Sequence, residues 1–191
     1  MKNTVLFDFF GVISSEIAPF WFRRHFNDEE SDRIKAEIVS LGDVGALTEE
    51  ETYQRISERT NIPPEQIEKE WMELVVINED LVSFVKEIRN KYPIYLLSNA
   101  IGPFLTRILQ QYGLYDLFDK IYISSEMKIA KPDPAFYQYV LKDLGLEPAD
   151  AVMIDDNPAN IAGAAACGID GILFSSNDAF SREFDARFDG K

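Results

Sequence analysis

TVLFDFFGV, residues 4–12, is the stretch around which the chain is organised. Four residues of largely apolar, β-favouring character lead into Asp8, and an aromatic pair and Gly11 follow it. A short apolar run bounded by glycine predicts a buried strand of a parallel sheet. Such a strand places Asp8 at its carboxyl end, where ligands bind in open α/β sheets. Taken alone, Asp8 could equally end the strand or cap the next segment, so its role depends on residues further along.

Composition restricts the classes of protein to which the chain can belong. Its 191 residues suffice for one core domain with a modest insertion, and 46% of them are apolar, enough for a globular core. The formal net charge of −14 argues against nucleic acid or an anionic membrane as a partner, because no basic stripe can neutralise phosphates. A small phosphorylated metabolite stays compatible, since it needs only a local positive charge.

Cysteine usage and hydropathy indicate the compartment. The single cysteine, Cys167, excludes an internal disulfide and suits a reducing environment. No apolar stretch approaches the ~20 residues of a membrane span, and no signal peptide is recognisable before the first predicted strand. We therefore expect a cytoplasmic protein without a membrane partner, whose oligomeric state the sequence leaves open.

Residues 15–77 have a helical period and contain no strong strand candidate. Thr48 and Glu51 have the form of a capping box, and Pro64 begins a further helix. We therefore predict a small helical domain at residues 15–77, inserted into a core formed by residues 1–14 and 78–191.

Strands and helices alternate regularly over residues 78–191. Asn78 is expected to cap a helix, and apolar strand-like runs follow at residues 93–97, 121–123, 151–154 and 171–174. Helices are predicted at residues 103–112, 134–144 and 158–166, and in the tail beyond residue 181. This alternation predicts an α/β fold with a Rossmann-like, three-layer core, in which helices cover both faces of a parallel sheet.

Polar side chains follow the predicted strands at the point where each strand ends, and one lysine precedes a Pro-Asp-Pro turn. These residues are Asp8, Ser98, Asn99, Lys131, Asp155 and Asp156. Adjacent parallel strands bring such positions to one crevice, where three carboxylates would repel one another unless they are countered. Lys131 supplies one positive charge, and a hard cation is the natural second.

Mg²⁺ suits this site because it takes carboxylate and carbonyl oxygens, keeps several waters and bridges to phosphate. The lack of His and Cys ligands argues against zinc. Asp8 and Asp156 would hold the ion, with Asp155 in or near its coordination sphere. Asn160, one helical turn beyond Asp156, is expected to orient this acidic loop; the alternative is that it extends a surface turn.

The same residues predict phosphoryl transfer. Asp8 is the candidate nucleophile, which would form an aspartyl-phosphate intermediate. The Ser98 hydroxyl and the Asn99 amide can donate hydrogen bonds to phosphoryl oxygens. Lys131 would neutralise both the phosphoryl group and Asp8, which is the electrostatic clamp that such transfers require.

Four segments carry a family resemblance: FDxxGV at residues 7–12, LSN at 97–99, KPDP at 131–134 and DDNPxNI at 155–161. In this order they resemble the four motifs of the haloacid dehalogenase superfamily, and residues 15–77 resemble its small α-helical cap. The chain is most similar to bacterial sugar-phosphate phosphatases related to the glucose-1-phosphate phosphatases. The resemblance implies a Mg²⁺-dependent hydrolase of phosphomonoesters with an aspartyl nucleophile, and a metal contact from the backbone carbonyl of Phe10.

One position departs from the superfamily pattern. Most phosphatases of the superfamily carry a second aspartate two residues after the nucleophile, which protonates the leaving group and then activates water. Here that residue is Phe10, which can do neither, and general acid–base assistance typically contributes about 10²–10⁴-fold. The loss matters least for good leaving groups, such as those of aryl or acyl phosphates.

Phe10 keeps two alternatives open beside a slow phosphatase. One is a catalytically weak or inactive relative that binds phosphate. The other is a metal-independent 2-haloacid dehalogenase, since an aromatic residue at this position also resembles those enzymes. The acidic pair Asp155-Asp156 favours the phosphatase, because without a cation it would repel an anionic halo acid.

Overall fold

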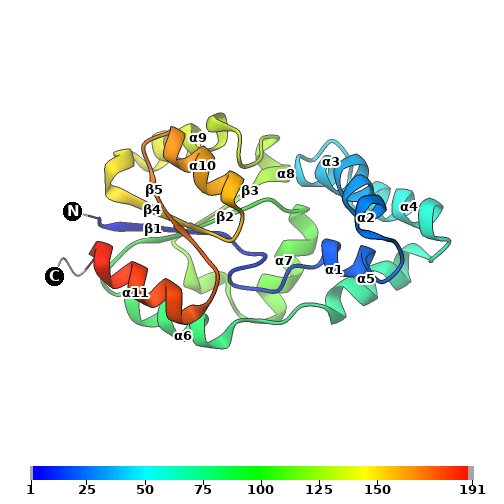
Figure 1. The fold of residues 1–191 in the computed structure, drawn as a ribbon, viewed down its shortest axis with the longest axis horizontal. Coiled ribbons are helices and arrows are strands. Elements are labelled where there is room, and N and C mark those ends of the chain that lie inside the picture. Colours follow the sequence, from blue (N-terminus) through cyan, green and yellow to red (C-terminus); the bar gives the residue numbers. More distant parts are fainter. Residues whose placement is uncertain (1, 189–191) are drawn as a thin grey trace.

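The computed structural model describes residues 2–188 of the chain. A parallel five-stranded sheet forms its centre, with the strand order β3-β2-β1-β4-β5 (Figure 1). The strands are β1 (Thr4–Phe7), β2 (Ile94–Ser98), β3 (Lys120–Ile123), β4 (Ala151–Asp155) and β5 (Asp170–Leu173). β1 is central, and its Phe7 pairs with Leu96 of β2 and Ile154 of β4. The predicted parallel α/β sheet is confirmed.

Side chains of β1 alternate between two hydrophobic clusters, one on each face of the sheet. Val5 and Phe7 belong to the larger cluster, and Leu6 belongs to the smaller. The larger is covered by α6 (Glu79–Ile88), α7 (Gly102–Gln111) and α11 (Asn177–Phe188), and the smaller by α9 (Pro134–Leu144) and α10 (Pro158–Ala166). Figure 1 shows α9 and α10 above the sheet and α6 and α11 below it, so the core has three layers.

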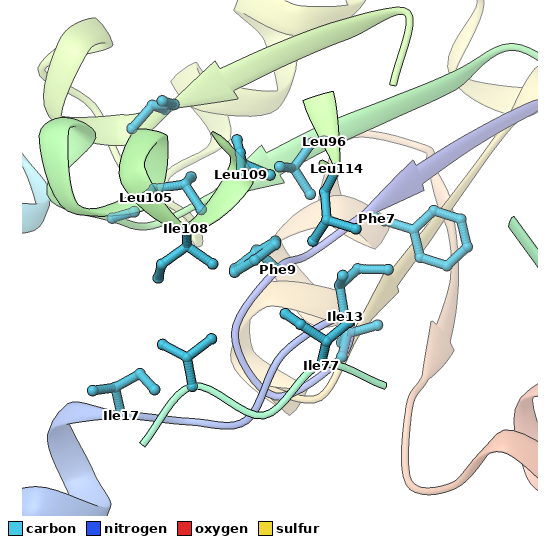
Figure 2. Packing of buried hydrophobic residues seen from close by; sticks show 14 of the residues in the cluster. Phe7, Phe9, Ile13, Ile17, Ile77, Leu96, Leu105, Ile108, Leu109 and Leu114 are labelled. Carbon is cyan, nitrogen blue, oxygen red and sulfur yellow. The ribbon is translucent and has the colours of Figure 1, made fainter. Parts of the chain in front are cut away.

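The larger cluster fixes the loop that follows β1. Figure 2 shows Phe9 beside Ile108 of α7, and Phe7, Leu96 of β2 and Leu105 of α7 belong to the same cluster. All five side chains are completely buried. Burial of a side chain of this size stabilises a protein by about 1.5–3 kcal/mol relative to exposure. The backbone around Asp8 is therefore anchored by apolar packing on both sides.

The chain between β1 and α6 forms a helical segment, residues 15–77. It contains α1 (Ala18–Phe22), α2 (Asp28–Ile34), a π-helix (Lys35–Val39), α3 (Ser40–Asp43), α4 (Glu49–Thr60) and α5 (Pro64–Glu73). The expected capping box between Thr48 and Glu51 is present at the start of α4. Figure 1 shows these helices beyond the carboxyl ends of the strands. Trp71 of α5 contacts Phe104 of α7, with ring centroids 5.7 Å apart, so the helical segment and the sheet share one hydrophobic cluster.

The two connections between the helical segment and the sheet lie side by side. Ser14 forms an antiparallel bridge with Ile77, and the Asn78 N–H donates to the Ile13 carbonyl at 2.9 Å. Asn78 also caps α6 as expected, because its side chain accepts from the Leu81 N–H at 3.2 Å. These contacts lie where the sequence places the ends of the insertion, while the division into two domains stays a prediction.

The tail helix begins earlier than expected. It runs from Asn177 rather than from beyond residue 181, which adds Phe180 to its buried face. Phe180 and Phe184 both pack edge-on against Phe84 of α6, each with centroids 5.2 Å apart. Contacts with a distant helix thus extend α11 beyond what its own sequence indicates.

Short elements were not predicted, because a single turn has no measurable period. They are α8 (Ser124–Met127) and the 3₁₀ turns Tyr115–Leu117 and Pro148–Asp150. None of the helices within residues 2–188 combines the length and the apolar character needed to cross a membrane.

Candidate active site

Asp8 directly follows β1 and lies at the carboxyl end of the sheet. Its N–H donates to the Ile154 carbonyl at 2.9 Å, which extends the pairing of β1 with β4 by one residue. Its Oδ1 accepts from the Phe9 N–H at 2.7 Å and lies 2.9 Å from Lys131 Nζ. The side chain is 10% exposed, and Asp8 lines a cavity. Oδ1 is therefore fixed by two contacts inside the protein, while Asp8 also lines the cavity.

The Lys131 ammonium joins two carboxylates inside the protein. Its Nζ lies 2.9 Å from Asp8 Oδ1 and 2.6 Å from Asp155 Oδ2, and the side chain is completely buried. Asn99 holds the backbone of Lys131: its Nδ2 donates to the Lys131 carbonyl at 2.7 Å, and its Oδ1 accepts from the Lys131 N–H at 2.9 Å. The loop after β2 thus positions the lysine beside Asp8.

Asp155, the last residue of β4, is held by hydrogen bonds to both of its oxygens. Oδ1 accepts from the Asn157 N–H at 2.9 Å, and Asn160 Nδ2 lies 3.0 Å from Oδ1 and 3.1 Å from Oδ2. Asn160 is only 5% exposed, and its own carbonyl accepts from the Tyr137 O–H at 2.7 Å. Asn160 therefore contacts the acidic loop, as expected, and the consequence for activity stays a prediction.

Asp156 lines the same cavity and is half-buried. Gly11, with a φ of +82°, passes so close that a Cβ at this position would overlap the Asp156 carboxylate. Glycine meets both requirements, since it has no Cβ and readily adopts positive φ. Burial raises the pKa of Asp156 to about 6, and the charges of Glu16 and Asp155 add to the increase.

Three carboxylates meet at this point. Asp8, Asp155 and Asp156 each place one oxygen within 4.8 Å of the others. Burial raises the pKa of Asp8 well above its ordinary value, and Asp155 adds to the rise although Lys131 opposes it. Burial alone would lower the pKa of Lys131, but Asp8 and Asp155 raise it. One ammonium does not balance three carboxylates, so this donor set fits a hard divalent cation with oxygen ligands.

Two of the predicted residues are placed differently from the rest. Ser98 is completely buried, is not among the residues that line the cavity, and its Oγ has no hydrogen-bond partner within residues 2–188. The Phe10 ring lies in the cavity wall and stacks on Phe104, with centroids 6.2 Å apart and planes at 14°. Hydrocarbon therefore occupies the position two residues after Asp8.

A cavity of about 250 Å³ lies where the strand ends meet the helical segment. The helical segment contributes Glu16, Ile17, Ala18, Pro19, Lys35, Val39, Ser40, Asp43 and Trp71 to its lining. The rest comes from the core: Asp8, Phe10, Asn99, Ala100, Ile101, Phe104, Lys131, Pro132, Asp156, Asn157 and Asn160. Its size is close to the lower end for ligand sites, which indicates a small molecule.

Three charged residues of the helical segment line the cavity although no motif in the sequence points to them. They are Glu16, Lys35 and Asp43. Asp43, with glycines at positions 42 and 45, carries the only local signal, an acidic residue in a turn of small residues. Their position depends on how the helices pack on the sheet, which a local pattern does not encode.

Comparison with known proteins agrees with this architecture. A family model described as haloacid dehalogenase-like hydrolase matches residues 2–168. The sesquiterpene phosphatase of Aspergillus oryzae is 27% identical over 164 residues, which cover 76% of this chain and 83% of that protein. The drimenol cyclase of Aspergillus calidoustus is 28% identical over 157 residues, 78% of this chain. The chain spans only 30% of that cyclase.

A solved structure covers almost the whole chain. It is a HAD family enzyme of Bacteroides thetaiotaomicron in complex with magnesium and inorganic phosphate. It matches with a TM-score of 0.81 and 26% identity over 96% of this chain and 100% of that one. The names of these three proteins do not include a glucose-1-phosphate phosphatase, so that finer assignment stays a prediction. Because the family model spans most of the chain and the fold agrees along its length, the chain belongs to the haloacid dehalogenase-like hydrolases.

Proposed function

We propose that this hydrolase is a Mg²⁺-dependent phosphatase of small phosphomonoesters, with sugar phosphates as one candidate class. The observation that carries the proposal is the Lys131 ammonium between Asp8 and Asp155, with Asp156 in the same cavity. This arrangement offers a nucleophile, a positive charge for phosphoryl oxygens and acidic groups for a cation. The relative named as a sesquiterpene phosphatase, and the magnesium and phosphate bound in the Bacteroides enzyme, support it.

We further propose that residues 15–77 act as a cap over a catalytic core formed by residues 1–14 and 78–191. The side-by-side connections at Ser14 and Ile77 support this division, because the chain leaves and re-enters the core at one place. The contribution of the helical segment to the cavity lining supports a role in selecting the substrate and excluding water.

Asp8, Asp156 and the Phe10 carbonyl would hold the Mg²⁺, with Asp155 beside them. When bound, the ion offsets the negative charge of the phosphoryl group and polarises its oxygens. Asp155 also accepts from Lys131, Asn157 and Asn160, which suits it to hold the lysine in place as well.

In the first chemical step, a carboxylate oxygen of Asp8 attacks phosphorus while the bond to the leaving oxygen breaks. This leaves an aspartyl phosphate on Asp8. Lys131 balances charge on the phosphoryl oxygens. The Asn99 amide, which lines the cavity, is proposed to donate to them through the N–H that the Lys131 carbonyl does not take. The buried Ser98 hydroxyl would have to turn toward the cavity to donate as well. Water then attacks phosphorus, which releases inorganic phosphate and restores the Asp8 carboxylate.

The test is turnover of p-nitrophenyl phosphate by the purified protein, with Mg²⁺ and with a chelator. We expect activity that requires Mg²⁺ and that falls on the order of 10³-fold or more in Asp8→Asn, because the nucleophile is lost. Asp178→Asn, a substitution at an exposed position of α11, is the matched control and should keep full activity. Equal rates in chelator, or an active Asp8→Asn variant, would overturn the proposal.

Phe10 favours one alternative, a relative that binds phosphate but hydrolyses it weakly or not at all. That protein would show no turnover of the aryl phosphate, yet phosphate with Mg²⁺ would still raise its thermal stability. Metal-independent release of halide from a 2-haloacid would instead indicate a dehalogenase.

A further inference from the structure

Besides Asp8 and Asp156, the cavity is lined by two carboxyl groups that the proposed mechanism does not use, Glu16 and Asp43. Asp43 ends α3, lines the cavity from the helical segment and is half-buried. Within residues 2–188, its carboxylate has no hydrogen bond or ion pair; only its backbone carbonyl accepts, from the Ser124 hydroxyl. Asp43 is therefore an unpartnered acid that lines the same cavity as Asp8 and Phe10.

The backbone of Asp43 is fixed on the loop that follows β2. The Ser124 hydroxyl donates to the Asp43 carbonyl and accepts from the Ala100 N–H at 3.0 Å. A Cβ at Gly42 would lie 2.7 Å from Thr52 Oγ1 and 3.0 Å from Ile101 Cγ1, so α3 packs directly against this loop. The loop also carries Asn99, which holds Lys131. The same structural unit thus positions both Asp43 and Lys131.

A π-helix aligns the residues that precede Asp43. The π-helix Lys35–Val39 joins α2 to α3 without a break. Its wider turn brings Lys35 and Ser40, five residues apart, to the same side, and both line the cavity together with Asp43. Single π-turns within helices are rare and frequently occur at functional sites. The π-helix therefore places three polar residues of the helical segment, Lys35, Ser40 and Asp43, in the lining of the cavity.

The surroundings of Asp43 suit a group that both gives and takes a proton. Burial raises its pKa to about 7, Glu16 adds to the increase, and Lys35 opposes it. Lys35 and Glu16 are the charged residues from the facing elements that act on this carboxyl. A general acid–base catalyst works best when its pKa lies near the working pH.

We propose that Asp43 supplies the general acid and base that the residue at position 10 lacks, an inference that rests on the proposed phosphatase function. As Asp8 attacks phosphorus, the P–O bond to the leaving group breaks and Asp43 gives its proton to the departing oxygen. Asp43 is then a carboxylate, which takes a proton from the water that attacks the aspartyl phosphate. Phosphate leaves, Asp8 is again a carboxylate, and Asp43 is again protonated.

The test compares two substrates that share an aromatic ring but differ in leaving group. p-Nitrophenyl phosphate expels a stable phenolate, whereas benzyl phosphate expels a basic alkoxide that needs a proton. In Asp43→Asn, with Mg²⁺, we expect kcat/KM for benzyl phosphate to fall about 10²-fold or more, and that for p-nitrophenyl phosphate to fall less than tenfold. Because kcat/KM reports the first irreversible step, this contrast isolates proton donation to the leaving group.

The control is Asp32→Asn, which removes an exposed carboxylate from α2 and should change neither substrate. The pH profile is the second readout. For the wild type, kcat/KM with benzyl phosphate should fall at high pH as Asp43 ionises, and this fall should be absent in Asp43→Asn. Equal losses on both substrates, no loss, or an unchanged profile would overturn the role of Asp43. A wild type inactive on both substrates would instead overturn the phosphatase proposal.

Discussion

Lys131 Nζ lies 2.6 Å from Asp155 Oδ2, and neither side chain is exposed to solvent. Removing one partner of a buried ion pair leaves an uncompensated charge in a medium that solvates it poorly. Here the loss of the ammonium would leave two buried carboxylates without a counter-charge, because Asp8 contacts the same Lys131 Nζ at 2.9 Å. The pair therefore links the stability of the protein to the chemistry of its site.

Lys131→Met should lower the free energy of unfolding by about 3–5 kcal/mol, since two buried carboxylates lose their counter-charge. Urea denaturation in chelator measures this. Lys120→Met is the matched control, because the pair of Lys120 with Asp143 is 49% and 30% exposed and such surface pairs contribute about 1 kcal/mol or less. Similar losses in the two variants would contradict the prediction.

Mg²⁺ should stabilise the folded protein through the acidic cluster. A ligand that binds only the folded state adds about 2.7 kcal/mol at a concentration of 100 times its Kd. We expect Mg²⁺ to raise the midpoint of thermal unfolding, and Asp156→Asn to remove most of the rise. Asp178→Asn should respond like the wild type, and an undiminished response in Asp156→Asn would show that this carboxylate does not bind the ion.

Asp43 should make stability depend on pH. Its pKa is raised to about 7, against about 3.9 in an unfolded chain, so the folded state binds this proton more tightly. That contribution is complete below about pH 4 and is lost as pH rises through 7. The amide side chain of the Asp43→Asn variant does not titrate, so the variant lacks this loss. Between pH 4 and pH 8, the free energy of unfolding of the wild type should therefore fall relative to that of the variant by on the order of 2 kcal/mol. Urea denaturation at several pH values measures this change. The control Asp32→Asn should depend on pH in the same way as the wild type.

Phe10→Asp should restore a carboxyl group two residues after the nucleophile. We expect it to raise kcat/KM for benzyl phosphate by up to about 10²-fold in the Asp43→Asn background, and less in the wild type, where Asp43 already serves. Phe10→Asn is the matched control, because it also removes the stacking on Phe104 but cannot transfer a proton. Equal effects of the two substitutions would argue against proton transfer from position 10.

Much of the fold could be predicted from the sequence, because its signals are local. The apolar run of β1, the cap at Asn78 and the capping box at Thr48 each depend on residues a few positions apart, and all three are present in the structure. The early start of α11 could not be predicted, since it depends on contact between Phe180 and the distant Phe84.

In the candidate site, too, some features could be predicted from the sequence and others could not. The grouping of Asp8, Lys131, Asp155 and Asp156 could be predicted, because the carboxyl ends of parallel strands meet at one edge of a sheet. The contacts of each side chain could not. That the Asn99 amide holds the Lys131 backbone, and that Ser98 is buried outside the cavity lining, follow from the packing of separate loops.

By itself, the sequence determined the order of strands and helices, the family and which polar residues lie at the strand ends. These follow from periodicity and from short motifs, which act over neighbouring residues. Only the tertiary structure decided which carboxylates share one ammonium, and that Asp43 of the helical segment faces the cavity of Asp8. The physical reason is that burial and electrostatic environment are set by elements far apart in the chain, and they exist only once those elements have packed.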